Sequence, residues 1–152
     1  MYLNLIPKLK TIFEAVVIHE ITGGDDLKLD VYPYPLSEGE YPSKYPALVF
    51  FPSDYTNEFS SGQTNFKNIK FKAILMMDAK NISGEDLYTF TLPNAADKLS
   101  QALDKEWDMG RIDNKRVWMM SDVAIWGKYS EDNSDIAFVD LDILIKMETK
   151  VE

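Results

Sequence analysis

The amino-acid sequence predicts an α+β fold: a mostly antiparallel β-sheet with two α-helices packed on one face and a long β-hairpin arm. Apolar residues recur at helical spacing in residues 5–21 and 91–107. Two further apolar runs, residues 47–51 and 69–77, flank a long polar segment, which is the pattern of a hairpin. The resulting order, α-β-β-β-α-β-β, is typical of helices that cover one face of an antiparallel sheet.

The composition indicates one globular domain, residues 1–152. Of the 152 residues, 45% are hydrophobic and 27% are charged, which are ordinary globular values. The absence of cysteine excludes disulfides and thiolate metal sites. No apolar run is long enough to cross a bilayer, so we expect no membrane partner. The net charge of −9, with no basic cluster, argues against sequence-specific nucleic-acid binding.

The first helix is predicted to span residues 5–21, with Asn4 as its cap and Pro7 in its first turn. The only histidine, His19, falls near the predicted helix end. We interpret it as a favourable contact with the helix dipole, because no nucleophile motif that could use a histidine base is present. The apolar stripe of this helix consists of Leu5, Ile6, Leu9, Ile12, Phe13, Val16, Val17 and Ile21.

A short strand is predicted at residues 27–32, where apolar and polar side chains alternate. Prolines interrupt the following segment, so residues 34–44 are predicted to form a connection or an edge segment. The tyrosines of this loop are residues typical of protein interfaces.

The hairpin is the segment around which the rest of the sequence is organised. Its first apolar run is predicted to be an interior strand that ends at Pro52. Residues 53–65 are polar, and we predict an arm that reaches past the sheet, with its tip near Gly62. The return strand, residues 69–77, begins solvated and ends buried. Unstructured loops of this length are uncommon in compact domains and are usually functional or disordered.

The second helix is predicted over residues 91–107, with Thr91 as its cap, Pro93 in its first turn and Gly110 near its end. Its apolar stripe consists of Leu92, Ala95, Ala96, Leu99, Ala102, Leu103 and Trp107.

Two long strands, residues 116–128 and 135–147, are predicted to close the sheet, and residues 148–152 are predicted to fray. A bulge is expected at Ser121 and Asp122, where the apolar pattern is interrupted. Around it, we assign Val117, Met119, Val123 and Ile125 to one face, and Trp118, Met120, Ala124 and Trp126 to the other. In the last strand, burial of four side chains is worth about 1.5–3 kcal/mol each. Because a slip of one residue would expose them, they also set the register of the strand. They are Val139, Leu141, Ile143 and Ile145.

No catalytic, cofactor-binding or phosphate-binding motif occurs in the sequence, and we expect no cofactor. Asp140 and Asp142 stand on one face of the last strand, and Asp122 on a neighbouring strand could approach them. Such a group could hold Mg²⁺ or Ca²⁺, but a solvated sheet face or a subunit contact is the preferred interpretation. The three tryptophans could offer a stacking platform for single strands, but without a basic groove core packing is preferred.

The hairpin region resembles the tail terminator proteins of long-tailed bacteriophages. Tyr45-Pro46-Ala47, followed by an apolar strand and Pro52, matches the first strand of that family. The run from Ile69 to Met77 matches its return strand, and residues 92–107 match its helix over the sheet. The long Tyr/Pro loop at residues 33–46 departs from the family pattern.

This resemblance implies a structural virion protein and no enzyme. It implies a ring, usually of six subunits, at the head-proximal end of the tail, assembled in the host cytoplasm. The ring would contact the tail tube protein, stop tube polymerisation, and join the tube to a head connector or neck protein. The residues expected at subunit or tube contacts are Tyr55, Asn57, Glu58 and Phe59 of the arm, and Asp140 and Asp142.

Two alternatives remain open at the level of sequence. One is another head–tail connector, neck or baseplate adaptor protein with the same α+β layout. The other is a small metal-dependent hydrolase that uses the acidic pairs.

Overall fold

A computed structural model describes residues 2–59, 64–128 and 135–150 of the chain. The elements follow one another in the order α1 (Tyr2–Glu14), β1 (Val17–Ile18), β2 (Leu27–Lys28), β3 (Asp30–Tyr32), β4 (Ala47–Phe59), β5 (Thr64–Asp78), α2 (Gly84–Asp86), the π-helical segment η1 (Leu87–Thr91), α3 (Leu92–Lys105), β6 (Asp108–Ile112), β7 (Lys115–Lys128) and β8 (Ile136–Lys150). The hairpin tip near Gly62 and residues 129–134 lie outside the described part.

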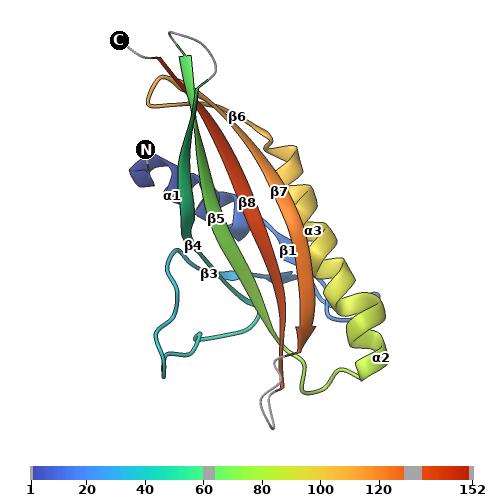
Figure 1. Ribbon diagram of the computed structural model, residues 1–152. Helices are drawn as coiled ribbons and strands as arrows, with labels where there is room; N and C mark the ends of the chain where they lie inside the picture. The colour runs from blue at the N-terminus through green and yellow to red at the C-terminus, as the bar shows by residue number, and fades with distance from the viewer. Residues whose placement is uncertain (1, 60–63, 129–134, 151–152) are drawn as a thin grey trace.

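A six-stranded sheet in the order β3-β4-β5-β8-β7-β6 forms the body of the molecule (Figure 1). All neighbouring strands in it are antiparallel except β3 and β4, which are parallel. Strands β1 and β2 form a separate two-stranded sheet. The predicted α+β class, with a mostly antiparallel sheet, is therefore confirmed.

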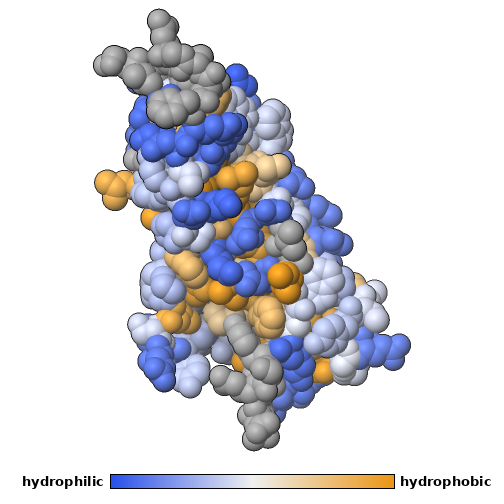
Figure 2. Space-filling model, viewed as in Figure 1, coloured by the Kyte–Doolittle hydropathy of each residue, from blue (hydrophilic) through white to orange (hydrophobic). Residues whose placement is uncertain are grey.

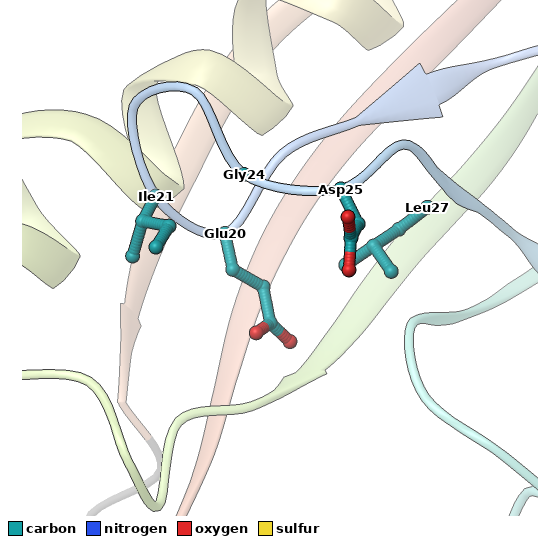
Figure 3. Close-up of a pocket in the computed structure, with 5 residues that line it drawn as sticks. All are labelled: Glu20, Ile21, Gly24, Asp25 and Leu27. Carbon is teal, nitrogen blue, oxygen red and sulfur yellow. The ribbon is translucent and has the colours of Figure 1, made fainter.

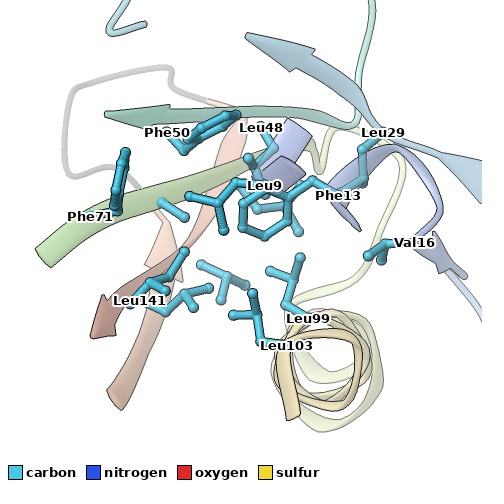
Figure 4. Close-up of a cluster of buried hydrophobic side chains, with 14 of the residues drawn as sticks. Leu9, Phe13, Val16, Leu29, Leu48, Phe50, Phe71, Leu99, Leu103 and Leu141 are labelled. Carbon is cyan, nitrogen blue, oxygen red and sulfur yellow. The ribbon is translucent and has the colours of Figure 1, made fainter. Parts of the chain in front are cut away.

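Both long helices cover the same face of the sheet, as predicted, and Figure 4 shows the core between them. Phe13 of α1 packs against Phe50 of β4, with ring centroids 5.5 Å apart, and Leu99 and Leu103 of α3 complete the cluster. We call this side of the sheet the helix face and the other side the open face. The predicted register of the last strand is confirmed, because every second residue from Ala137 to Met147 is buried on the helix face.

The first helix is shorter than predicted. It begins at Tyr2 and ends at Glu14, and the chain then becomes extended in β1. Val16 and Ile18 are buried while the intervening residue is only partly buried, so the second half of the predicted stripe belongs to an extended segment with a period of two. Asn4 does not cap the helix, because it lies within it and its side chain donates to Asp113 Oδ1 at 2.5 Å.

Two further predictions for the N-terminal half are wrong, namely the place of Pro7 and the single strand at residues 27–32. Pro7 lies inside α1 and not in its first turn. The strand predicted at residues 27–32 is divided, because β2 pairs with β1 while β3 pairs with β4. The backbone N–H of Asp30 donates to the carbonyl of Pro46 at 3.0 Å, which marks where the chain enters the large sheet. The connection predicted at residues 34–44 spans residues 33–46, between β3 and β4.

The hairpin is longer and more regular than predicted. Strand β4 does not end at Pro52, and the predicted polar arm forms paired strand up to Phe59 and from Thr64 onward. Proline is tolerated because β3 borders β4 only at Ala47–Val49, so Pro52 lies on an edge and next to a bulge. Strand β5 also pairs with β8 along its full length, so the described hairpin is part of the sheet and does not reach past it.

The second helical region begins before its predicted start. Ser83 caps α2, its hydroxyl accepting from the Asp86 N–H at 3.1 Å, and the chain stays helical through η1 into α3. Thr91 is buried and has no capping role, because its hydroxyl donates to the Glu20 carbonyl at 2.6 Å. The helix ends at Lys105. Gly110 lies beyond the helix end in β6, at a bulge where its φ is +73°.

Strand β7 contains the predicted bulge, between Ser121 and Ala124. One extra residue there reverses the alternation of side chains in the rest of the strand. The predicted assignment of side chains to the two faces did not take this reversal into account. Ile125 pairs with Asp140 on the open face, and Trp126 pairs with Val139 on the helix face. Their predicted faces were therefore wrong. Strand β8 continues to Lys150, so residues 148–150 are not a frayed tail.

Candidate assembly interface

The residues predicted on the arm lie on both faces of β4. A bulge at Ser53 shifts the register between Pro52 and Asp54, and this shift reverses the alternation in the far half of the strand. Tyr55 pairs with the buried Ile69 and Asn57 pairs with Lys67, which places them on the helix face. Glu58 pairs with Phe66 on the open face. The side chain of Phe59 lies outside the described part.

Glu58 is held by two partners on the open face. Asn68 Nδ2 donates to Glu58 Oε2 at 3.2 Å, and Lys146 Nζ lies 3.5 Å from the same oxygen. The hydrogen bond from Asn68, followed by the charge of Lys146, lowers the pKa of the Glu58 carboxyl below its ordinary value. Because the contact joins β4, β5 and β8, it fixes the position of an exposed carboxylate.

Tyr55 is oriented by its neighbours on the helix face. Lys67 Nζ lies 5.6 Å from the centre of the Tyr55 ring, and the Tyr55 hydroxyl donates to Asn57 Oδ1 at 3.3 Å. The side chain nevertheless remains 38% exposed. Tyr55 therefore presents an aromatic ring to solvent at a defined place on the sheet edge.

Asp140 and Asp142 lie on the open face, as their strand position predicted. Lys72 Nζ is 3.4 Å from Asp140 Oδ2, and Lys72 is also the direct cross-strand neighbour of Asp142. Asp122 lies in the bulge of β7, whose pairing with β8 is interrupted there. Within the described residues, no group of three or more candidate ligand side chains could hold a metal ion. Asp140 and Asp142 are therefore part of a charged surface on the open face, with Lys72 as their neighbour of opposite charge.

His19 is not in a helix, contrary to prediction. It follows β1, and its Nδ1 lies 3.2 Å from the carbonyl oxygens of Gly24 and Asp25, while Nε2 lies 3.4 Å from Asp26 Oδ1. It therefore ties the turn after β1 together. The adjacent hollow of about 240 Å³ is lined by this turn, with the carboxylates of Glu20 and Asp25 (Figure 3).

The open face carries apolar and aromatic side chains that the sequence prediction had placed in the core. Trp107 is 55% exposed, and it borders a hollow of about 340 Å³ together with Trp118, Met120, Leu144 and Lys146. Figure 2 shows apolar residues interspersed with charged ones over this face. The sequence does show that side chains alternate between two faces in β5 and β8. This alternation could not show that no helix covers the open face.

Cations flank these aromatic rings. Arg116 stacks on Trp118, with the guanidinium carbon 5.1 Å from the ring centre, and Lys146 Nζ lies 4.5 Å from the centre of Phe66. The Phe66 and Trp118 rings are themselves 6.2 Å apart. Such stacks are common in protein interfaces, where aromatic residues and arginine are enriched.

The tyrosine loop, residues 33–46, is held to β3 by hydrogen bonds. The Tyr32 hydroxyl donates to Asp30 Oδ2 at 2.6 Å and accepts from the Ser43 N–H at 3.0 Å. Burial, and next the charges of Asp78 and Tyr41, raise the pKa of Tyr45 above its ordinary value. Tyr34 and Tyr41 remain exposed.

Comparison with models of known protein families gives no match for this chain, and comparison with curated proteins gives no significant match. In the described part of the chain, no helix is long and apolar enough to cross a membrane.

Proposed function

We propose that this chain is the subunit of a ring, usually of six copies, that caps the tail tube of a long-tailed bacteriophage and joins the tube to the head connector. The observation that carries the proposal is the far half of β4. Every side chain from Pro52 to Glu58 is exposed, although the backbone belongs to a regular sheet. A strand segment that buries none of its own side chains adds little to the core, and its surface is available to a neighbour.

The order of elements also supports the proposal. The resemblance to tail terminators implies an N-terminal helix, a hairpin, a helix over the sheet and a closing strand pair. Here these are α1, β4–β5, α3 and β7–β8, and both helices pack on one face. The opposite face therefore stays available for contacts with the tube or the connector.

The distribution of charge favours assembly at moderate salt. Each copy carries −9, so six copies repel one another at long range unless salt screens them. Locally, the open face pairs charges of both signs, as between Lys72 and Asp140 and between Lys146 and Glu58. A ring with this acidic balance would let DNA pass through its lumen without adhering to it.

The proposal is tested by the solution mass of the chain across a salt series, followed by electron microscopy with tail tube subunits. We expect particles of six times the 17.4 kDa chain mass that become more populated as salt rises, and tubes that stop growing when the chain is added. A chain that stays monomeric at every salt concentration contradicts the proposal. Rings that bind tubes without limiting their length would instead indicate a neck or baseplate adaptor.

A matched pair of deletions isolates the contribution of the hairpin end. Deletion of residues 58–62 should abolish ring formation and capping, whereas deletion of residues 36–40, five residues in the loop after β3, should leave both intact. If both deletions leave the ring and its capping unchanged, the hairpin end has no part in the mechanism.

A further inference from the structure

Both edges of the six-stranded sheet are open over part of their length. On one side, β3 borders β4 only at Ala47–Val49. On the other side, β6 pairs with β7 only as far as Trp118. Beyond that pair, the outward edge of β7 makes one more backbone hydrogen bond in the described part of the chain, from the Met119 N–H to the Trp107 carbonyl. Among the described residues, no strand lies beside the outward edge of β4 after Val49 or of β7 after Met119.

The open edge of β7 exposes large apolar side chains. Ile125 is 61% exposed on the open face, and Trp126 is 40% exposed on the helix face. Proteins usually protect an edge strand with lysine, proline or a covering segment. Between Met120 and Trp126, β7 contains no lysine and no proline, and its bulge, another protective feature of edge strands, precedes Ala124, so residues 124–126 lack such protection. An apolar, unpaired edge of this kind is a surface for strand pairing.

We infer that neighbouring subunits join edge to edge, with the far half of β4 of one copy pairing antiparallel with the open edge of β7 of the next. This inference rests on the ring proposed above. The two strands run in opposite directions within one sheet, because β4 is antiparallel to β5, β5 to β8 and β8 to β7. Two copies placed side by side in the same orientation therefore present the two edges to each other in antiparallel fashion.

The faces of the two strands select the register. Tyr55 and Trp126 both lie on the helix face, and Thr56 and Ile125 both lie on the open face. Placing Tyr55 opposite Trp126 sets Thr56 opposite Ile125, so Ile125 and Trp126 each gain a cross-strand partner. A slip of one residue would put side chains of opposite faces against each other, so the sheet could not continue across the contact.

Charge excludes one competing arrangement. If two β4 edges paired symmetrically about Thr56, Asp54 of each copy would stand opposite Glu58 of the other, and like charges directly opposite are destabilising. A symmetric pair of β7 edges about Ile125 has no such penalty, because Asp122 would face Lys128. The experiment below distinguishes that dimer from the ring contact.

The stagger of the proposed contact is compatible with a ring. Within one subunit, Tyr55 is level with Ile145 of β8, and Trp126 is level with Val139. Pairing them between copies offsets neighbours by six residues of β8, roughly 20 Å, across the four strands β4-β5-β8-β7 that separate one contact from the next, roughly 19 Å. This offset corresponds to a strand tilt of about 46°, close to the upper end of the range of about 35–45° found in closed sheets.

Disulfide trapping tests the contact, because the chain has no cysteine and introduced thiols are therefore the only ones. The double variant T56C/I125C should form a covalent ladder up to the full ring on mild oxidation, at least tenfold more than the matched control T56C/W126C. In the control, the second thiol is one residue away and on the other face. All three positions are exposed, so the substitutions should not disturb the core, and folding is checked by an unchanged melting curve.

The outcomes separate the contact from the ring itself. A ring of full mass in which T56C/I125C forms no ladder overturns the edge contact and leaves the proposed function standing. Efficient dimerisation of I125C alone overturns it in favour of the symmetric β7 pair, and a chain that is monomeric at every salt concentration overturns both proposals. In the unmodified chain, amide hydrogen exchange at Tyr55 and Trp126 should slow at least tenfold on assembly, because the alternation of the ladder points their N–H groups away from the sheet, and unchanged exchange contradicts the contact.

Discussion

The two halves of the β4–β5 hairpin share one ladder of backbone hydrogen bonds but have different roles. In the near half, Leu48 and Phe50 of β4 and Phe71 and Leu75 of β5 are fully buried under the helices. In the far half, after the bulge at Ser53, the described side chains of β4 are exposed while β5 stays paired on both sides. The comparison teaches that strand pairing and core burial are separable: the near half stabilises the fold, and the far half offers a surface.

The largest expected effect is truncation of a near-half aromatic residue. Phe71→Ala should lower the free energy of unfolding by about 3–5 kcal/mol, because its buried ring contacts both Phe50 and Tyr2. Urea denaturation of the variant measures this. Tyr55→Ala, on the same face but beyond the bulge, is the control and should cost less than about 1 kcal/mol. Equal losses at the two positions would remove the distinction between the halves.

The next effect comes from inserting one alanine between Asp54 and Tyr55. The inserted residue takes the position opposite Ile69 and each later residue of β4 moves along by one, so Thr56 and Glu58 move toward the helix face and Tyr55 toward the open face. We expect a loss of about 1–3 kcal/mol in urea denaturation and loss of assembly by solution mass. Substitution of Ser53 by Ala keeps the residue count and should preserve both properties.

Tyr55→Ala should change assembly far more than stability. The residue is exposed in the single subunit, but the proposed contact places it opposite Trp126 of a neighbour. We expect at least a tenfold rise in the concentration needed for ring formation, measured by light scattering. Tyr41→Ala, at an exposed tyrosine of the loop after β3, is the control. An unchanged assembly concentration for Tyr55→Ala would show that this residue in the far half of β4 does not contribute to subunit contacts.

The smallest effect is the pH response of Glu58. Because its pKa is lowered in the folded chain, its contacts with Asn68 and Lys146 stabilise the fold above the ordinary carboxyl pKa. This contribution is lost as pH falls through the folded pKa. The effect is small, since the group is exposed and screened by solvent. An NMR titration of the Glu58 carboxyl should show the lowered pKa, and Lys146→Ala should move it back part of the way.

Sequence reasoning predicted the fold class, the α3 stripe and the register of β8, because these depend on long periodic patterns such as the buried series through Val139, Leu141 and Ile143. It mistook the far half of β4 for loop, because Pro52 and a polar run resemble a strand end. Pairing with β5, which sequence patterns do not show, is what keeps that segment extended.

The candidate interface was only partly predictable. Tyr55 and Glu58 were named from the unexplained length of the arm, but which face each of them takes follows from the one-residue bulge at Ser53, which the sequence pattern did not indicate. Ile125 and Trp126 were assigned to the wrong faces because the effect of the bulge predicted at Ser121 and Asp122 was not carried into the second half of the strand. Trp107 was assigned to the core because nothing in a single sequence indicates that one face of the sheet lacks a helix.

The position of β8 has a consequence for how the chain folds. It lies in the middle of the sheet, between β5 and β7, yet it is the last strand in the sequence. Its partner β5 precedes it by more than fifty residues, so the central pairing is non-local and carries a high loop-closure cost. During synthesis, the two hairpins β4–β5 and β6–β7 can form early, but the core between them closes only after residues 136–150 have left the ribosome.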